Sequence, residues 1–447
     1  MNTDSDEVDL QYLAHVGGMT AQHEFEASED IFSRTGLKLL VKGAPISAAT
    51  CERLLQHKLS KPLAACLAIV GGVQSQDLAA LGERLLAQHS LLRSICVDSS
   101  SVPMATFWIE LQLSPQVLAL LSIYAHQHAD RLPHAVGVAM LALGLARKLM
   151  PADLEQQGLI AIAGLLHDVG ELYIDPEILR RDQPLDAEKW RHIATHPLIG
   201  HRVLSTLPGA GPVVAEAVLQ HHERLDGFGY PRAASGKQFH LGGQILAAAE
   251  WLIALIESGA SPTTRASVAA KLIPGEFSPQ VVTMIRASAR VSQEFSLRQP
   301  LPVEQLTAQL LNITKALQSF HESHEWWLER VSKASPALRQ LLHLGQQRMT
   351  RIQFAFSSSG LDIHSPEKML QELNEEPNGD ALLELTALAR EFGWRVQELK
   401  REVLLRAGSL HAADAAVVHS WVERLVCSQL PRTPSVQATM QEVRMAA

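Results

Sequence analysis

Cysteine is scarce in this chain, and the few cysteines present are not arranged in pairs. Four of the 447 residues are cysteine, and no Cys-x-x-Cys motif occurs among them. Scattered cysteines of this kind are typical of reduced thiols in a cytoplasmic protein rather than of a disulfide framework. We therefore expect Cys51, Cys66, Cys96 and Cys427 to be free and mostly buried.

The chain also lacks excess positive charge and long hydrophobic runs. Its formal net charge of -8 argues against a general grip on a nucleic acid polymer through the phosphates. The most apolar stretches, Pro62 to Val73 and Ile245 to Ile256, are too short to span a membrane or carry a charge. No basic start followed by an apolar run is present at the N-terminus, so no signal peptide is expected. These absences predict a soluble, cytoplasmic protein that does not enter a membrane.

What the chain does have is the length and composition of a globular protein with several domains. At 447 residues it exceeds one ordinary core, and 47% of its residues are hydrophobic against 19% charged. A short strand is expected at Leu37 to Val41, and apolar residues at helical spacing dominate from Pro115 onward. The predicted fold class is therefore mainly α. It comprises a helical bundle, a small N-terminal α/β or α domain, and a helical C-terminal region.

Changes in this pattern divide the chain into five expected parts. These are a flexible acidic tail (1–30), a small regulatory domain (31–114), a helical domain with the motifs below (115–299), a helical region (300–430) and a loose tail (431–447). The regulatory domain is not a phosphoryl receiver, because no strand in it ends in an acidic cluster with a phospho-acceptor aspartate. The C-terminal helices carry no recognisable chemistry, so they either pack on the preceding domain or dimerise.

Histidines gather in three short motifs of the helical domain. The motifs are LLHDVG from Leu165, HPLIG from His196, and HHERLDGFGYP from His221. Neutral imidazole and carboxylate are the side chains that suit iron, manganese or zinc. His221 and His222 would point about 100° apart on a helix, so each could face a different ion. Any one motif also fits a helix-end histidine bonded to its neighbour, but the three together favour a metal centre.

Together these motifs resemble an HD-GYP domain, the output module of bacterial cyclic di-GMP signalling. The match consists of the His167-Asp168 doublet, the HPLIG motif, and the last motif with its Gly-Tyr-Pro ending, and it covers roughly Leu121 to Arg290. The resemblance implies a helical HD-type bundle. It also implies a metal-dependent phosphodiesterase that opens cyclic di-GMP to the linear dinucleotide pGpG, with GMP as a further product.

The resemblance also implies which residues hold metal. Two divalent ions, iron or manganese, are expected, with Asp168 bridging them in a two-metal hydrolysis. His167 and Asp168 form the expected catalytic doublet. Asp130, one turn before His134, would bind a third ion or else be a solvated carboxylate at a helix start. The expected metal ligands are His134, His167, Asp168, His196, His221, His222 and Glu250.

Substrate and partner contacts are expected at the glycine-rich loop. Glycines and a proline stop the preceding helix, and such a loop beside a metal site leaves room for a large ligand. An ordinary surface turn is the alternative. A GGDEF-domain protein is the partner that the resemblance implies for this loop, and a homodimer is left open. The expected substrate-binding residues are Asp226, Gly227, Gly229, Tyr230 and Pro231.

Four departures from the family pattern fall near the expected site. Glu250 stands where an aspartate is usual, Ile253 replaces a second aspartate, and Glu171 replaces a lysine that could meet a substrate phosphate. Pro262 to Arg265 is a poor substitute for an Arg-Pro-Tyr-Arg-like segment. These changes support a second hypothesis, a non-catalytic sensor or scaffold. A nucleotide phosphohydrolase of the wider HD group is a third, which leaves the Gly-Tyr-Pro loop unexplained.

Overall fold

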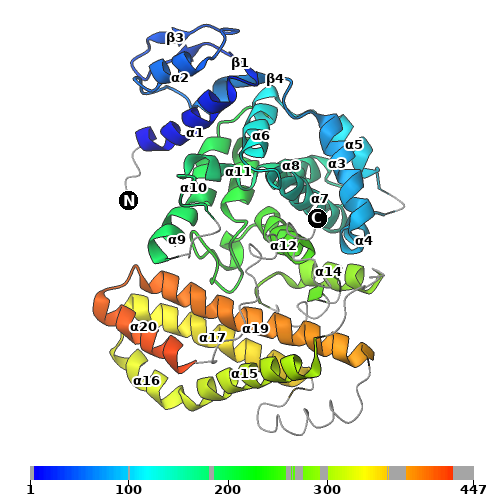
Figure 1. Ribbon diagram of the computed structural model, residues 1–447, viewed down its shortest axis with the longest axis vertical. Helices are drawn as coiled ribbons and strands as arrows, with labels where there is room; N and C mark the ends of the chain where they lie inside the picture. The colour runs from blue at the N-terminus through cyan, green and yellow to red at the C-terminus, as the bar shows by residue number, and fades with distance from the viewer. Residues whose placement is uncertain are drawn as a thin grey trace. The chain divides into compact units, whose positions relative to one another are not determined.

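The computed structural model describes residues 5–98, 101–180, 186–257, 263, 265–266, 275–291, 301–359, 361 and 379–425. The described chain is mainly helical, which confirms the predicted fold class (Figure 1). It forms two compact units. The first contains Met1–Asp182, His192–Ala254 and Gly275–Met284; the second contains Gln183–Arg191, Leu255–Pro274 and Ile285–Ala447. The five expected domain boundaries stay predictions.

Helix α1 (Ser5–Met19) occupies much of the segment that we expected to be a flexible tail, so that prediction was wrong. The helix is held by apolar side chains. Tyr12, Val16 and Met19 are buried, and the Tyr12 ring stacks on the Tyr173 ring with centroids 5.0 Å apart. These three residues follow helical spacing, but the acidic residues around the start of the helix masked that stripe in the sequence.

Two small antiparallel sheets follow α1. Strand β1 (Glu24–Ala27) pairs with β4 (Leu67–Val70), and β2 (Ile31–Phe32) pairs with β3 (Lys38–Leu40), which confirms the expected strand. Helix α2 (Ala48–Leu54) begins after Ser47, whose hydroxyl accepts a hydrogen bond from the Thr50 amide at 3.2 Å. The 3-10 turn η1 (Leu63–Cys66) leads into β4.

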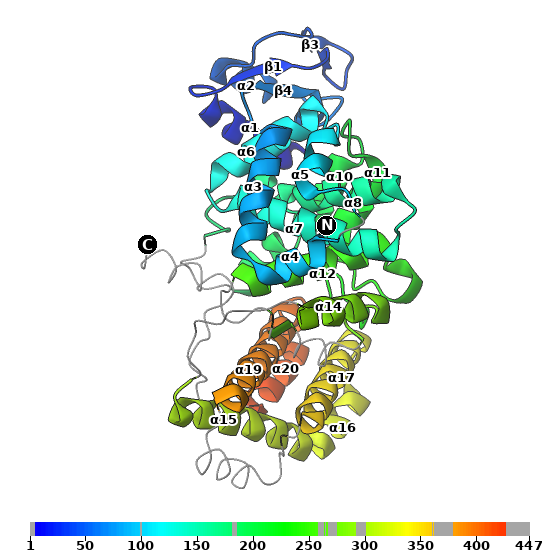
Figure 2. The same cartoon turned by 90° about the vertical axis from the view of Figure 1, so that its right-hand side faces the viewer.

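Three helices then pack beside the centre of the first unit. They are α3 (Ser75–Gln88), α4 (Ser90–Cys96) and α5 (Met104–Glu110). Helix α3 contacts α5, and both α3 and α4 contact α7 (Figure 2). Of the cysteines in the described part of the chain, Cys51, Cys66 and Cys96 are free and buried, as predicted. Cys427 lies outside the described residues.

The centre of the first unit is a bundle of apolar helices. Helices α7 (Arg131–Leu149) and α8 (Leu154–Leu166) pack closely, because Gly164 lies against the backbone of Ala139, where a Cβ would collide. Ser114 caps the N-terminus of α6 (Pro115–Gln127) by accepting a hydrogen bond from the Val117 amide at 3.1 Å. The helices are α6 (Pro115–Gln127), α7 (Arg131–Leu149), α8 (Leu154–Leu166), α10 (His196–Leu204), α11 (Gly211–Leu219) and α12 (Leu241–Glu257), with the short turn η2 (Val169–Tyr173).

Helix α7 is the one described helix whose length and composition would also suit a membrane span. Its residues from Ala135 to Ala146 are buried inside the unit. The helix therefore serves as a core helix of this bundle, and its apolar character is explained by packing. The remaining short elements are α9 (Ala187–Ile193), η3 (Gly236–Gln238) and α14 (Pro279–Val291).

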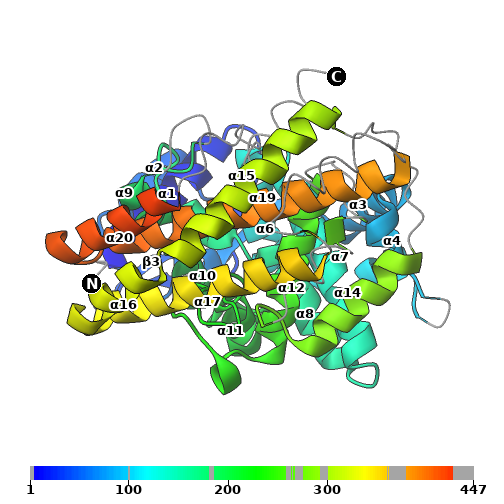
Figure 3. The same cartoon turned by 90° about the horizontal axis from the view of Figure 1, so that it is seen from below.

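The second unit consists of long amphipathic helices. They are α15 (Val303–Glu322), α16 (His324–Lys333), α17 (Pro336–Ser358), α19 (Gly379–Ala407) and α20 (Ala412–Arg424). Helix α19 packs against α15, α17 and α20 (Figure 3). Helix α15 carries apolar side chains at helical spacing, and they are fully buried: Leu306, Leu310, Ile313 and Leu317. Inside this unit Glu391 is buried between Arg265 and Arg395, so the carboxylate is paired on both sides. The expected tail at 431–447 lies outside the described residues.

Candidate metal centre

The start of α7, the end of α8 and the middle of α12 bring together three of the predicted ligands, which we call the first group: His134, His167 and Glu250. His134 lies in the first turn of α7, and His167 caps the C-terminus of α8. Their Nε2 atoms are 3.3 Å apart. The Glu250 Oε2 atom lies 3.3 Å from His134 Nε2 and 3.2 Å from His167 Nε2. Three ligand atoms therefore face a single point.

A second group forms beside the first and consists of Asp168, His196, His221 and His222. His196 is the first residue of α10, and the two adjacent histidines follow the end of α11. The Nε2 atoms of His196 and His221 are 3.1 Å apart and lie 3.3 and 3.5 Å from Asp168 Oδ1. The other carboxylate oxygen, Oδ2, lies 3.3 Å from His167 Nε2. Asp168 thus faces both groups, one oxygen toward each.

Backbone carbonyls set the protonation of three imidazoles. The Nδ1 atoms of His167, His196 and His221 lie 2.8, 2.8 and 2.6 Å from carbonyl oxygens of Gly164, Ile193 and Val218. A carbonyl can only accept, so each Nδ1 carries the proton and each Nε2 of a neutral ring presents a lone pair. Hydrogen bonds of this kind, from the ring nitrogen that faces away from the ion, are typical of metal-binding histidines.

The donor sets therefore fit cations. In the neutral tautomers, the Nε2 lone pairs of His196 and His221 face each other at 3.1 Å, and no hydrogen bond can form between two acceptors. A divalent ion between them would replace that repulsion with two ligand bonds. Imidazole and carboxylate together suit iron, manganese and zinc, so the residues present match a metal-dependent centre without deciding the element.

Burial opposes charge at the centre, and the neighbours decide which groups stay ionised. Burial raises the pKa of Asp168 and Glu250, but facing histidines outweigh it and hold both pKa values well below their usual range. Burial lowers the pKa of His167, yet the two carboxylates outweigh it and raise that pKa to about 10. The pKa of His222 is well below its usual range because of burial and the neighbouring His221. The His222 imidazole is therefore neutral at pH 7.

A glycine lets two members of the second group, Asp168 and His196, approach each other. Gly170, in η2, lies so close to α10 that a Cβ would collide with the His196 carbonyl oxygen and meet the Gly200 amide nitrogen. The turn that follows Asp168 therefore packs directly on the first turn of α10. That packing brings Asp168 and His196 within reach of one ion.

Comparison with protein families matches residues 117–275 to the HD domain. This range contains both ligand groups and the Gly-Tyr-Pro loop. We therefore call residues 117–275 the HD domain of this chain. The remaining parts of the chain, before 117 and after 275, are not covered by that match.

Several curated relatives align with this HD domain. A cyclic di-GMP phosphodiesterase of Pseudomonas aeruginosa is 34% identical over 126 residues, 28% of this chain and 30% of its own length. A 3'3'-cGAMP-specific phosphodiesterase of Vibrio cholerae is 30% identical over 207 residues, 46% of this chain and 43% of its own. A cyclic di-GMP phosphodiesterase of Thermotoga maritima is 30% identical over 148 residues, 32% and 38%. The chain thus spans less than half of each of these relatives.

The Gly-Tyr-Pro loop of the HD domain is anchored beside the second group. The Tyr230 ring stacks on the His222 ring with centroids 4.6 Å apart. Glu223 is buried, and its two carboxylate oxygens accept from the amides of Arg232 and Ala234 at 2.7 and 2.9 Å. Gly227 has a φ of +76°, which favours glycine at this turn. The loop is therefore held in one shape against a metal ligand.

The other predicted loop residues have structural neighbours of their own. The Asp226 carboxylate accepts from the Phe228 amide at 3.0 Å, which closes a turn within the loop. Gly229 lies against the backbone of Glu223, where a Cβ would collide. Pro231 follows Tyr230 through a cis peptide bond. Contact of these residues with a substrate stays a prediction.

Each departure from the family pattern that lies in the described chain has a defined environment. Glu250 occupies a ligand position in the first group. Glu171 pairs with Arg131 at close range. Ile253 is buried against Gly137, so it is a core residue of the bundle. Asp130 lies outside both groups and 3.5 Å from His128 Nδ1. Of the segment Pro262 to Arg265, only Thr263 and Arg265 are described.

Sequence reasoning missed three residues around the centre. Tyr124 donates to Asp168 Oδ2 at 3.4 Å, and Arg131 lies over the Tyr124 ring, 4.7 Å from its centroid. Glu223 clamps the loop as described above. Tyr124 lies among apolar residues at helical spacing in α6, a pattern that indicates a core position and not a site residue. The position of Arg131 three residues before His134, on the same helix face, was the available signal.

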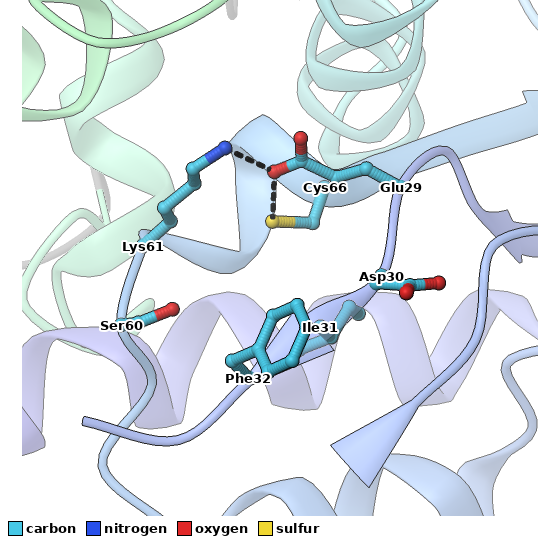
Figure 4. Close-up of a pocket in the computed structure, with 7 residues that line it drawn as sticks. All are labelled: Glu29, Asp30, Ile31, Phe32, Ser60, Lys61 and Cys66. Atoms are coloured by element: carbon cyan, nitrogen blue, oxygen red, sulfur yellow. Dashed lines mark hydrogen bonds and ion pairs between the residues drawn. The ribbon is translucent and has the colours of Figure 1, made fainter. Parts of the chain in front are cut away.

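A separate hollow of about 260 Å³ lies in the N-terminal part, far along the chain from the histidines (Figure 4). Lys61 and Cys66 both point at the Glu29 carboxylate, at 2.6 and 3.3 Å from its Oε1 atom. Burial raises the pKa of the Cys66 thiol to about 12, so it stays protonated. The polar groups here satisfy one another, and nothing in the hollow points to a ligand.

Proposed function

We propose that this chain is a metal-dependent phosphodiesterase that hydrolyses cyclic di-GMP to the linear dinucleotide pGpG, and further to GMP. The observation that carries the proposal is the sharing of Asp168 between two groups of histidine and carboxylate ligands inside an HD domain. Relatives of this domain are named phosphodiesterases of cyclic di-GMP or of 3'3'-cGAMP. The substrate class is therefore a cyclic dinucleotide.

We propose iron or manganese as the bound metal, one ion in each group. His134, His167 and Glu250 would hold the first, and His196, His221 and His222 the second, with one oxygen of Asp168 on each side. When bound, such ions supply Lewis acidity toward a phosphate oxygen and lower the pKa of a water molecule. An additional ion at Asp130 would need ligands from outside the two groups.

The residues of the chain would hold the ligand atoms in position and exclude water from the site. Backbone carbonyls fix the rings of His167, His196 and His221, so the ligand atoms are preorganised. Burial of these rings lowers the local dielectric and strengthens every charge interaction with a phosphodiester. The anchored Gly-Tyr-Pro loop would form the wall against which a large ligand lies.

A catalytically degenerate sensor or scaffold is the second candidate. The observation that favours it is Glu171, a carboxylate three residues after Asp168, because an anion there opposes the approach of an anionic substrate. Glu250 argues in the other direction, since its oxygen lies as close to the two imidazoles as a ligand requires. Activity therefore decides between the two.

The test is anaerobic purification, metal analysis, and an assay of cyclic di-GMP and 3'3'-cGAMP hydrolysis. His167→Ala and Asp168→Ala should abolish turnover. His201→Ala is the matched control, because His201 lies on the same helix as His196 but outside both groups. Metal-loaded protein that cleaves neither dinucleotide would remove the enzyme and leave the sensor.

Partners and assembly are further proposals. The Gly-Tyr-Pro loop would bind a GGDEF-domain protein, and the C-terminal helices would mediate a homodimer in the cytoplasm. Light scattering of the full chain and of a Tyr230→Ala variant, with and without such a partner, tests both. If the full chain and the Tyr230→Ala variant are both monomers and neither binds the partner, both proposals are wrong.

A further inference from the structure

We infer that Arg131 binds the phosphate of the cyclic dinucleotide that is not being hydrolysed, and that Glu171 holds the Arg131 guanidinium in place at the edge of the metal centre. The inference rests on the proposed substrate class. It concerns two side chains that belong to neither ligand group and that the comparisons do not assign.

Both members of this ion pair start from backbone that carries metal ligands. Arg131 is the first residue of α7, one turn before His134 and on the same face of the helix. Glu171 lies in η2, three residues after Asp168. The pair therefore connects the helix of the first group to the turn of the second.

The guanidinium is held on two sides. Its Nη1 donates to Glu171 Oε2, and its plane lies over the Tyr124 ring at 4.7 Å from the centroid. The Tyr124 hydroxyl in turn donates to Asp168 Oδ2 at 3.4 Å. A single tyrosine thus separates the positive charge from the carboxylate that both groups share.

The pair is shielded but still reachable from solvent. The side chains of Arg131 and Glu171 are 19% and 18% exposed. In such a partly dry position a charge interaction is stronger than at an open surface. A guanidinium has five N–H donors in a planar fork, and the bond to Glu171 engages Nη1. Arg131 can therefore take a phosphate as a further acceptor.

The chemistry of the substrate calls for such a cation. A cyclic dinucleotide carries two phosphodiesters, and each bears one negative charge at neutral pH. While one is hydrolysed at the ions, the other remains beside the centre, where Glu171 and Asp168 would repel it. The fixed guanidinium supplies the opposite charge and the fork geometry that phosphate oxygens fit.

The test compares two substrates in the full chain loaded with metal. Cyclic di-GMP has two phosphodiesters, and bis(p-nitrophenyl) phosphate has one. Arg131→Gln should raise KM for cyclic di-GMP at least about ten-fold, the loss expected for one charge-assisted contact. Metal content and kcat/KM for the single phosphodiester should stay unchanged. Arg131→Lys should restore part of the affinity.

Glu171 and a distant arginine provide the controls. Glu171→Gln keeps an acceptor for the guanidinium but removes the competing anion, so KM for cyclic di-GMP should fall. Arg147→Gln removes the same charge from the other end of α7, where Arg147 lies over the Phe107 ring. This variant should change neither KM for cyclic di-GMP nor kcat/KM for bis(p-nitrophenyl) phosphate. Equal losses for both substrates in Arg131→Gln would mean a structural role and would overturn the inference.

Failure of the proposed function gives a different result. If the wild-type chain cleaves no cyclic dinucleotide, equilibrium binding of cyclic di-GMP by calorimetry replaces KM as the readout. Wild-type binding that weakens in Arg131→Gln supports the inference in a sensor. Binding that is equal in the two proteins, or absent from the wild type, overturns it.

Discussion

Single imidazoles at the candidate metal centre hold a proton on Nδ1, and whether Nε2 is also protonated decides what an ion must displace. His167 donates from Nδ1 to the Gly164 carbonyl and turns Nε2 toward two carboxylates. In metal-free protein, these carboxylates outweigh the effect of burial and raise the pKa of His167 to about 10, so Nε2 also carries a proton at pH 7. A metal ion and this proton compete for the same lone pair.

Metal binding should therefore release protons, and metal affinity should rise with pH. The folded-state pKa of His167 lies above its ordinary 6.5, so the extra proton stabilises metal-free protein fully below pH 6.5. That contribution is lost as pH rises toward 10. Titration calorimetry of manganese at pH 7.5 in two buffers of different ionisation enthalpy should give different heats. Equal heats would contradict a protonated His167.

Glu250 should serve as a ligand despite its extra methylene. Glu250→Ala should lose the ion of the first group and keep that of the second, because Asp168, His196, His221 and His222 remain. Glu250→Asp retains a carboxylate and should retain both ions. Metal analysis of the purified variants measures this. Full metal content in Glu250→Ala would show that Glu250 is not a ligand.

Sequence patterns identified ligand residues better than their neighbours. Histidine and aspartate at motif spacing predict a metal site, and the structure gathers all seven predicted ligands into two groups. Tyr124 and Arg131 could not be assigned this way. Their roles come from contacts with Asp168 and Glu171, which lie about forty residues further along the chain.

Among the structural elements, the contact of η2 with α10 sets the geometry of the centre. The two elements meet at Gly170, where there is no space for a side chain. Because η2 carries the residues after Asp168 and α10 begins at His196, a change in their separation moves ligands of the second group.

Gly170→Ala should destabilise the fold by about 2 kcal/mol or more, the typical cost of overpacking, and should reduce metal content. Gly158→Ala is the matched control. Gly158 lies within α8 with only Leu111 within ordinary contact distance, so alanine should stabilise that helix by about 0.5–1 kcal/mol. Urea unfolding and metal analysis measure both variants. Equal stabilities would show that η2 and α10 can separate without consequence.

Helix starts were predictable where a local signal exists. Pro197 in the first turn of α10 and Pro212 in the first turn of α11 mark helix starts by backbone chemistry alone. Helix α1 had no comparable signal. Its apolar stripe becomes meaningful only through Tyr173, which lies far away in sequence. Helix α1 was therefore not predictable from local sequence, because the contact that anchors it is a tertiary one.

On the scale of the whole first unit, α1 links the N-terminal part to the HD domain. Tyr12 of α1 stacks on Tyr173 at the end of η2, the same turn that carries Gly170 and Glu171. The N-terminal part is thus in direct contact with the turn that follows Asp168.

Tyr12→Ala should lower the free energy of unfolding by about 3 kcal/mol, because it removes a fully buried ring and an aromatic pair. Leu10→Ala is the control, since Leu10 lies on the same helix and is 46% exposed; its effect should be small. Thermal and urea unfolding of both variants measure the difference. Similar effects of the two substitutions would mean that α1 is not anchored through Tyr12.

The chain passes back and forth between the two units. The second unit takes Gln183–Arg191 and Leu255–Pro274 as well as the C-terminal helices. No single residue along the chain therefore separates the first unit from the second.

The order of the ligands along the chain has a consequence for biosynthesis. The second group is complete once His222 has been translated, whereas the first group waits for Glu250. Glu250 of α12 is therefore the last of the seven predicted ligands to be synthesised, and the first group cannot form before α12 has folded onto α7 and α8.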